Sequence, residues 1–137
     1  MLGEIARVCR RGGRILVADM LGSERPEQAR HHDEIERLCD PTHARALPRS
    51  EFDALIAGAG LVAVRAIESK LDYDLDEWMA HGAPAEAAQR EIVARMTSYV
   101  GDDRPGLAVR REDGRLRFTH RTVAFVLEHA PSPDAQP

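Results

Sequence analysis

The stretch "RVCRRGGRILVADM", Arg7 to Met20, decides the fold class of this sequence. Apolar residues at helical spacing lead into it, and Gly12 and Gly13 end that helix because glycine readily adopts the left-handed conformation found at helix C-termini. The segment "RILVAD", residues 14–19, follows, and its apolar run shows no alternation. Such a run is typical of a strand covered on both faces in a parallel sheet. The stretch therefore predicts an α/β protein in which this strand is an inner element.

The remaining elements alternate between helical and extended patterns. Pro26 suits the first turn of a helix that runs to about Leu38, and Ser50 with Asp53 resembles a capping box that starts another. Asp113-Gly114 is a two-residue hairpin signal. The other predicted elements are a strand at 61–69, a short helix from 74, an amphipathic helix around 88–99 and a strand at 119–129. The two ends of the last strand disagree about their apolar face, so we expect a bulge or break near His120.

Length and composition indicate one globular domain. The chain has 137 residues, a hydrophobic fraction of 43% and a formal net charge of -4. We predict a single domain over residues 1–129 and a disordered tail, "APSPDAQP", over 130–137. Basic and acidic residues are interspersed, which argues against nucleic acid as a partner. No apolar run is long enough to suggest a membrane partner, and the absence of a secretory pattern favours a cytoplasmic protein.

Several segments in a fixed order carry a family resemblance. They are "EIARVCRRGGRILVADM", "DPTHARALPRSEFDALIAGAGLVAVRAIES", "LDEWMA" and "GRLRFTHRTVAFVLEH". Together they resemble the C-terminal half of class I S-adenosylmethionine-dependent methyltransferases, of the ubiquinone and menaquinone biosynthesis type and its small-molecule relatives. The family's usual proline before the glycine pair is replaced here by Arg11.

The resemblance implies a partial Rossmann-like α/β fold. Its mixed sheet would hold the equivalents of the family's strands 5, 7 and 6, which are residues 14–19, 122–129 and 61–69. Helices would flank this sheet, and a late β-hairpin would follow the last helix. The family's first four strands have no counterpart in the sequence.

The cofactor motif of the family is also missing. The family holds its cofactor with a glycine-rich loop after one strand and an acid after the next, whereas the glycine pair here precedes a strand. The resemblance implies S-adenosylmethionine as cofactor but assigns no cofactor-binding residue, so its binding by this chain alone is not expected. We expect the substrate-side half of a small-molecule methyltransferase, incomplete or inactive alone. The alternative is a non-catalytic binding or oligomerisation module derived from a methyltransferase.

The strand edge Arg14–Asp19 suggests a partner. An unpaired, flat, apolar edge strand templates association, and soluble proteins avoid exposing one. We therefore expect this edge to be covered in the working protein. A second copy in a homodimer, a separately encoded N-terminal half, or a rearranged element of the same chain would each serve.

Candidate site residues cluster after the first strand. Ligands of open α/β sheets bind beyond the carboxyl ends of parallel strands, which points to Asp19 and Met20 as contacts for a small-molecule substrate. Asp19 could instead cap the segment that follows it. His43 could act as general base toward a hydroxyl substrate because its ordinary pKa lies near neutrality. The alternative is a hydrogen-bonded loop histidine.

Two further residues are substrate-binding candidates. By resemblance, the helix from Pro26 and the loop after it lie over the substrate cleft, so Arg45 is expected to contact substrate. His120, at the expected strand break, is the other candidate, with a structural hydrogen bond as its alternative.

Metal binding is not expected from the sequence. Cys39 and His43 follow the pair His31 and His32 closely. Their spacing matches no common zinc-ligand pattern, and the four residues divide between a helix and a loop. We therefore expect His31 and His32 to pack at the edge of the core.

Overall fold

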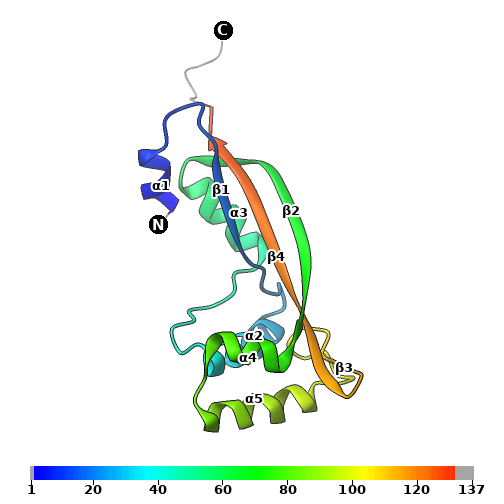
Figure 1. Ribbon diagram of the computed structural model, residues 1–137. Coiled ribbons are helices and arrows are strands. Elements are labelled where there is room, and N and C mark those ends of the chain that lie inside the picture. The colour runs from blue at the N-terminus through cyan, green and yellow to red at the C-terminus, as the bar shows by residue number, and fades with distance from the viewer. Residues whose placement is uncertain (1, 132–137) are drawn as a thin grey trace.

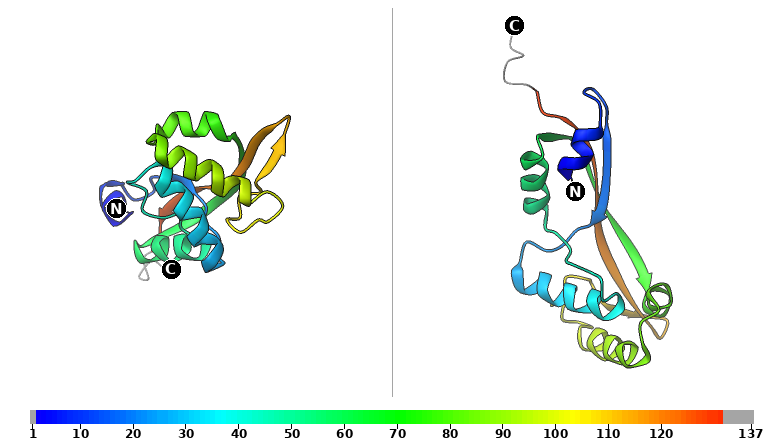
Figure 2. Two further views of the ribbon diagram at one scale, coloured as in Figure 1. Left: turned by 90° about the horizontal axis from the view of Figure 1, so that it is seen from below. Right: turned by 90° about the vertical axis from the view of Figure 1, so that its left-hand side faces the viewer.

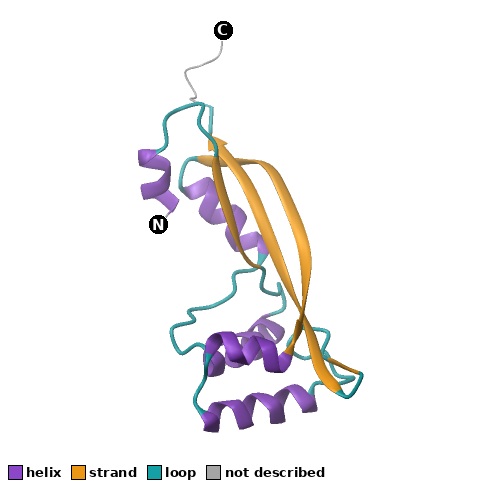
Figure 3. Ribbon diagram, viewed as in Figure 1, coloured by secondary structure: helices purple, strands orange, loops and turns teal. Residues whose placement is uncertain are grey.

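The computed structural model describes residues 2–131. Its central element is a four-stranded sheet (Figures 1 and 3). The strands are β1 (Ile15–Met20), β2 (Leu61–Asp74), β3 (Arg110–Glu112) and β4 (Arg115–His129). The order is β1-β4-β2, with β3 paired to the start of β4. β4 is antiparallel to each of the others, so β1 and β2 run parallel on either side of it. The predicted mixed α/β fold and strand order are confirmed.

Residues 2–131 also form five helices, which gather in two groups. They are α1 (Leu2–Val8), α2 (Pro26–Cys39), α3 (Arg49–Gly58), α4 (Leu75–Gly82) and α5 (Glu86–Ser98). Figure 2 shows α1 and α3 beside the sheet near one end of its long strands, and α2, α4 and α5 gathered near the other end of these strands. Across the described part of the chain, every helix is too short or too polar to cross a membrane.

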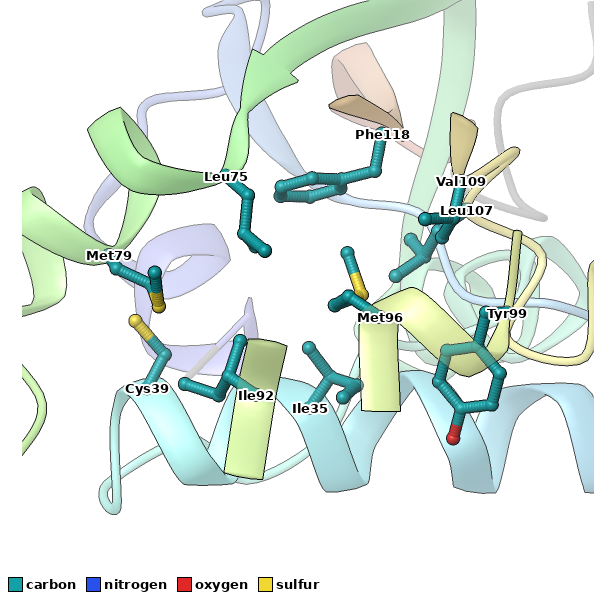
Figure 4. Close-up of a cluster of buried hydrophobic side chains, with 10 residues drawn as sticks. All are labelled: Ile35, Cys39, Leu75, Met79, Ile92, Met96, Tyr99, Leu107, Val109 and Phe118. Atoms are coloured by element: carbon teal, nitrogen blue, oxygen red, sulfur yellow. The ribbon is translucent and has the colours of Figure 1, made fainter. Parts of the chain in front are cut away.

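Each group of helices packs over its own hydrophobic cluster. The enclosed cluster, drawn in Figure 4, comprises Ile35, Cys39, Leu75, Met79, Ile92, Met96, Tyr99, Leu107, Val109 and Phe118. The sheet cluster comprises Ala6, Ile15, Leu21, Phe52, Ile56, Leu61, Val123, Phe125 and Leu127. β4 contributes to both clusters, so it joins the two halves of the molecule.

β4 is continuous through His120, and the bulge or break expected there is wrong. The register shift lies instead in β2, between Ala63 and Arg65. Phe118 is buried toward one face of β4, whereas Val123 and Phe125 are buried toward the other, because side chains alternate along a strand. The two ends of β4 therefore differ in their apolar face because the two helix groups cover opposite faces of an unbroken strand.

β1 is covered on one face, not on both as its sequence predicts. Ile15 is buried against the helices, whereas the side chain of Leu16 is 73% exposed. β4 occupies one edge of β1, and along 15–20 no other strand of the described chain pairs with its second edge. Further large apolar side chains are exposed on β2, on the other side of β4: Val62, Val64, Ile67 and Leu71. We call the second edge of β1 together with Leu16 the open edge.

The local turn signals are partly confirmed. Asp113 and Gly114 both adopt positive φ angles between β3 and β4, as the hairpin signal predicts. The capping box at Ser50 is wrong, because α3 has Pro48 at its N-cap and no side-chain cap. Ser50 instead donates its backbone N–H and hydroxyl to the Glu24 carboxylate, at 2.9 and 2.7 Å. The predicted tail lies almost entirely outside the described residues.

Candidate functional site

A surface cavity of about 470 Å³ lies beyond the carboxyl end of β1, between α2 and the start of α3. The chain after β1 makes a parallel bridge from Leu21 to Leu47, and the Gly22 N–H donates to the Leu47 carbonyl at 2.8 Å. A Cβ on Gly22 would lie 2.3 Å from the Ala46 carbonyl oxygen, so only glycine permits this approach. The close contact brings the 40–48 loop to the end of β1. The lining includes Ser23, Glu24, Asp33, Arg37, Arg45 and Ser50.

Asp33 organises one wall of this cavity. Its Oδ1 is 3.0 Å from His43 Nε2 and accepts the Ala46 backbone N–H at 2.8 Å. The Arg37 guanidinium lies 3.7 Å from the other carboxylate oxygen and donates to the Ala44 carbonyl at 2.9 Å. The carboxylate is mostly buried, so these contacts fix both the His43 ring and the loop. An imidazole oriented by a carboxylate is the usual arrangement of a general base.

His43 itself does not line the cavity, but its partner Asp33 does. The general-base role of His43 therefore stays a prediction. Arg45 does line the cavity, and its guanidinium pairs in a bidentate manner with Glu51. This pairing holds the pKa of the Glu51 carboxyl below its ordinary value. Substrate binding by Arg45 also stays a prediction, and a ligand would have to share or displace Glu51.

Asp19 and Met20 lie near the cavity but outside its lining. The Asp19 side chain is exposed and accepts a hydrogen bond from the Met20 backbone N–H at 2.7 Å. This local hydrogen bond agrees with the alternative in which Asp19 caps the segment that follows it. Met20 is half-buried, and the substrate-binding roles of both residues remain predictions.

His120 lies away from the cavity, in the interior between β4 and α2. Its Nε2 is 2.8 Å from Glu36 Oε1, and both side chains are buried. Burial by itself would raise the pKa of Glu36, but the hydrogen bond with His120 and the His32 ring 3.5 Å away lower it to about 2. Glu36 is therefore an ionised carboxylate in the core. A substrate contact by His120 stays a prediction, and the geometry supplies the structural hydrogen bond that was its alternative.

Sequence reasoning overlooked both carboxylates that hold these histidines. Asp33 and Glu36 are three residues apart on α2, and both are buried. Acidic residues are rarely buried unless they are paired. Glu36 lies one helical turn from both His32 and Cys39, and an acid beside that buried stripe was the signal that could have found it; Asp33 lies outside the stripe and carried no such signal.

The fold is that of methyltransferase structures. The crystal structure of BH2331 from Bacillus halodurans C-125, a provisionally assigned methyltransferase, matches 95% of this chain with a TM-score of 0.85 and 18% sequence identity. The crystal structure of YcgJ from Bacillus subtilis matches 96% of it, with a TM-score of 0.85 and 21% identity. The chain covers 62% and 57% of these two structures, respectively.

Sequence comparison links the chain to two bacterial proteins. It is 27% identical over 93 residues to the uncharacterised methyltransferase YcgJ of Bacillus subtilis, and 30% identical over 86 residues to the uncharacterised protein YafE of Escherichia coli. These matches span 68% and 63% of this chain but 37% and 42% of the relatives. No protein-family model matches the sequence. The chain is thus related to class I methyltransferases and corresponds to part of their length.

Proposed function

We propose that this chain is the substrate-side part of an S-adenosylmethionine-dependent methyltransferase that acts on a small molecule. The observation that carries the proposal is the open edge of β1. The sequence of β1 is apolar on both faces, but only one of its faces is covered and only one of its edges is paired. The fold around it matches methyltransferase structures. A second part that completes the sheet would pair with the free edge of β1 and cover its exposed face.

The described residues do not fit the cofactor by themselves. A nucleotide cradle needs glycines after a strand, so that backbone N–H groups can approach the ligand. The glycine after β1 is Gly22, and the Ala46 carbonyl occupies the space beside it that a ligand would need. We therefore assign the cofactor to the completing part and no step of methyl transfer to a cofactor site on this chain.

The contribution of this chain would be to bind and orient the substrate. The cavity beyond β1 is lined by guanidinium, carboxylate and hydroxyl groups, which suits a small polar molecule. Asp33 holds His43 at its margin, where the imidazole would take the proton of a hydroxyl substrate. Arg45 would contact an anionic substrate group. The sequence resemblance to the quinone-biosynthesis type suggests, as a narrower proposal, a hydroxylated aromatic substrate.

The completing part would dock on the open edge. For the methyltransferase the completing part is a separate chain that carries the cofactor site and pairs with β1, because a second copy of this chain would lack the same cradle. A second copy that pairs with β1 and covers Leu16 would instead form the module described below. Large exposed apolar patches mark such interfaces in soluble proteins. Pairing would also satisfy the backbone N–H and C=O groups of the free edge.

Calorimetry with S-adenosylmethionine and measurement of solution mass test this proposal together. We expect the isolated monomer to bind the cofactor no more tightly than about millimolar, because a partial pocket supplies few contacts. An assembled form should bind it stoichiometrically. Micromolar binding by a monomer would overturn the idea of an incomplete enzyme.

A non-catalytic binding or oligomerisation module is the second candidate, and the same open edge favours it. It predicts assembly without cofactor binding in any assembled form. A homodimer that uses the open edge and binds no S-adenosylmethionine at millimolar concentration would support the module and exclude the methyltransferase part, because it occupies the edge that the cofactor-bearing part needs.

A further inference from the structure

Three potential metal ligands meet in the interior, apart from the cavity described above. His32 and Glu36 lie one turn apart on α2, and His120 reaches them from β4. Glu36 Oε1 is 3.5 Å from His32 Nε2 and 2.8 Å from His120 Nε2, and one ligand atom of each residue lies within 4.8 Å of the others. The exposed fractions of His32, Glu36 and His120 are 3%, 6% and 4%. We call these three residues the buried triad.

An unsatisfied nitrogen points to a missing ligand at the triad. His32 Nε2 is buried and, within residues 2–131, has no hydrogen-bond partner. Buried polar groups are nearly always hydrogen-bonded, and an orphaned one costs stability. The nearest acceptor, Glu36 Oε1, lies 3.5 Å from His32 Nε2 and is already paired with His120 Nε2 at 2.8 Å, so it does not satisfy the His32 nitrogen.

We propose that the buried triad binds a divalent transition-metal ion of the zinc class. Imidazole nitrogens and a carboxylate oxygen are ligands that Zn²⁺ prefers, whereas Mg²⁺ and Ca²⁺ prefer oxygen ligands alone. Ligand atoms around tetrahedral zinc lie about 3.3 Å apart, given bonds of about 2.0 Å, and the distances from Glu36 Oε1 to the two imidazole nitrogens, 2.8 and 3.5 Å, bracket that value. The ion would occupy the space that His32 Nε2 faces, with a fourth position left for water or another ligand.

The surroundings fit a bound cation. The ring of His120 lies 4.9 Å from Phe118, 5.1 Å from Tyr73 and 6.3 Å from Trp78, measured between ring centroids. These aromatic walls limit the access of water to the three ligand atoms. A divalent ion held by residues of both elements would tie α2 to β4. This inference is independent of the proposed methyl transfer.

The test uses full-length protein purified without a histidine tag and freed of metal with EDTA. Zinc titration by calorimetry gives the stoichiometry, thermal unfolding gives the stabilisation, and Co²⁺ gives visible absorption bands that report ligand number. We expect one ion per chain and a rise in Tm of about 8 °C at a hundredfold excess over Kd. If variants that lack a triad residue still showed the zinc-induced rise in Tm and the cobalt absorption bands, the proposal would be contradicted.

Matched variants locate the ion. In His32→Leu the apo Tm should stay within about 3 °C of wild type, because the removed nitrogen has no partner in the apo chain. The zinc-induced rise in Tm and the cobalt bands should disappear. His31→Leu, on the neighbouring residue of the same helix, should retain both. His120→Gln should lose zinc binding as His32→Leu does.

Two results would overturn the metal site: no zinc binding by the folded wild-type protein, or binding by His32→Leu equal to that of wild type. Neither result bears on the open edge or on cofactor binding. The failure of this inference is thus distinguishable from the failure of the proposed function.

Discussion

The two hydrophobic clusters differ in how completely the chain encloses them. The enclosed cluster is surrounded by α2, α4, α5 and the start of β4, and its side chains point toward one another from all these elements (Figure 4). The sheet cluster is covered by α1 and α3 on one face, while Leu16 and Ile67 are exposed on the strands beside it. One half of the molecule is thus closed by the chain's own elements, whereas the other half leaves apolar side chains exposed on β1 and β2, where we propose that a partner docks.

Truncation within the enclosed cluster should have the largest effect. Phe118 is fully buried there, so Phe118→Ala should lower the free energy of unfolding by about 3–5 kcal/mol through lost burial and a cavity. Urea denaturation measures this loss. Val93→Ala, on a partly exposed position of α5, should cost less than about 1 kcal/mol. Equal losses in the two variants would show that the cluster is not closed.

A smaller effect is expected at the junction between β2 and α4. Burial by itself would raise the pKa of Asp74, but the Arg115 guanidinium and the N–H groups of Glu77 and Asp76 hold it below its ordinary value. A depressed carboxyl pKa stabilises the fold above the ordinary aspartate pKa, and this contribution is lost as pH falls through the folded value.

Asp74→Asn isolates that charge because asparagine also caps helices. The variant should be less stable than wild type at pH 7, and the difference should shrink as pH falls below about 4. Urea midpoints between pH 7 and pH 3 measure it. A difference that stays constant over this range would mean that the charge of Asp74 contributes nothing.

The open edge should give the smallest change in stability and the clearest change in association. Leu16 is mostly exposed, so Leu16→Lys should alter the free energy of unfolding by less than about 0.5 kcal/mol. A charged side chain on an edge strand opposes pairing. Analytical ultracentrifugation should therefore show that the wild-type assembly is lost. Undiminished assembly of Leu16→Lys would place the interface elsewhere.

Local signals in the sequence predicted much of the architecture. Asp113-Gly114 predicted the hairpin, and Asp74 with Glu77 began a helix, because both signals depend only on neighbouring backbone groups. Ser50 was misassigned as a cap because a partner from another part of the chain, Glu24, takes its hydrogen bonds. Competition from distant residues cannot be read from a local pattern.

The candidate site shows the same limit. His43 and Arg45 were identified from their place in a loop after α2, but Asp33, ten residues before His43, was not. Glu36 and His120 are 84 residues apart and meet only because β4 passes under α2.

Periodicity and turn chemistry in the sequence predicted the element types and the apolar character of β1, while the family resemblance supplied the strand order and the missing neighbour of β1. Only the tertiary structure decided that β4 buries opposite faces along its length, that Leu16 is left exposed, and that His32, Glu36 and His120 converge. Those features depend on which helix covers which face, and long-range packing, not local propensity, sets that choice.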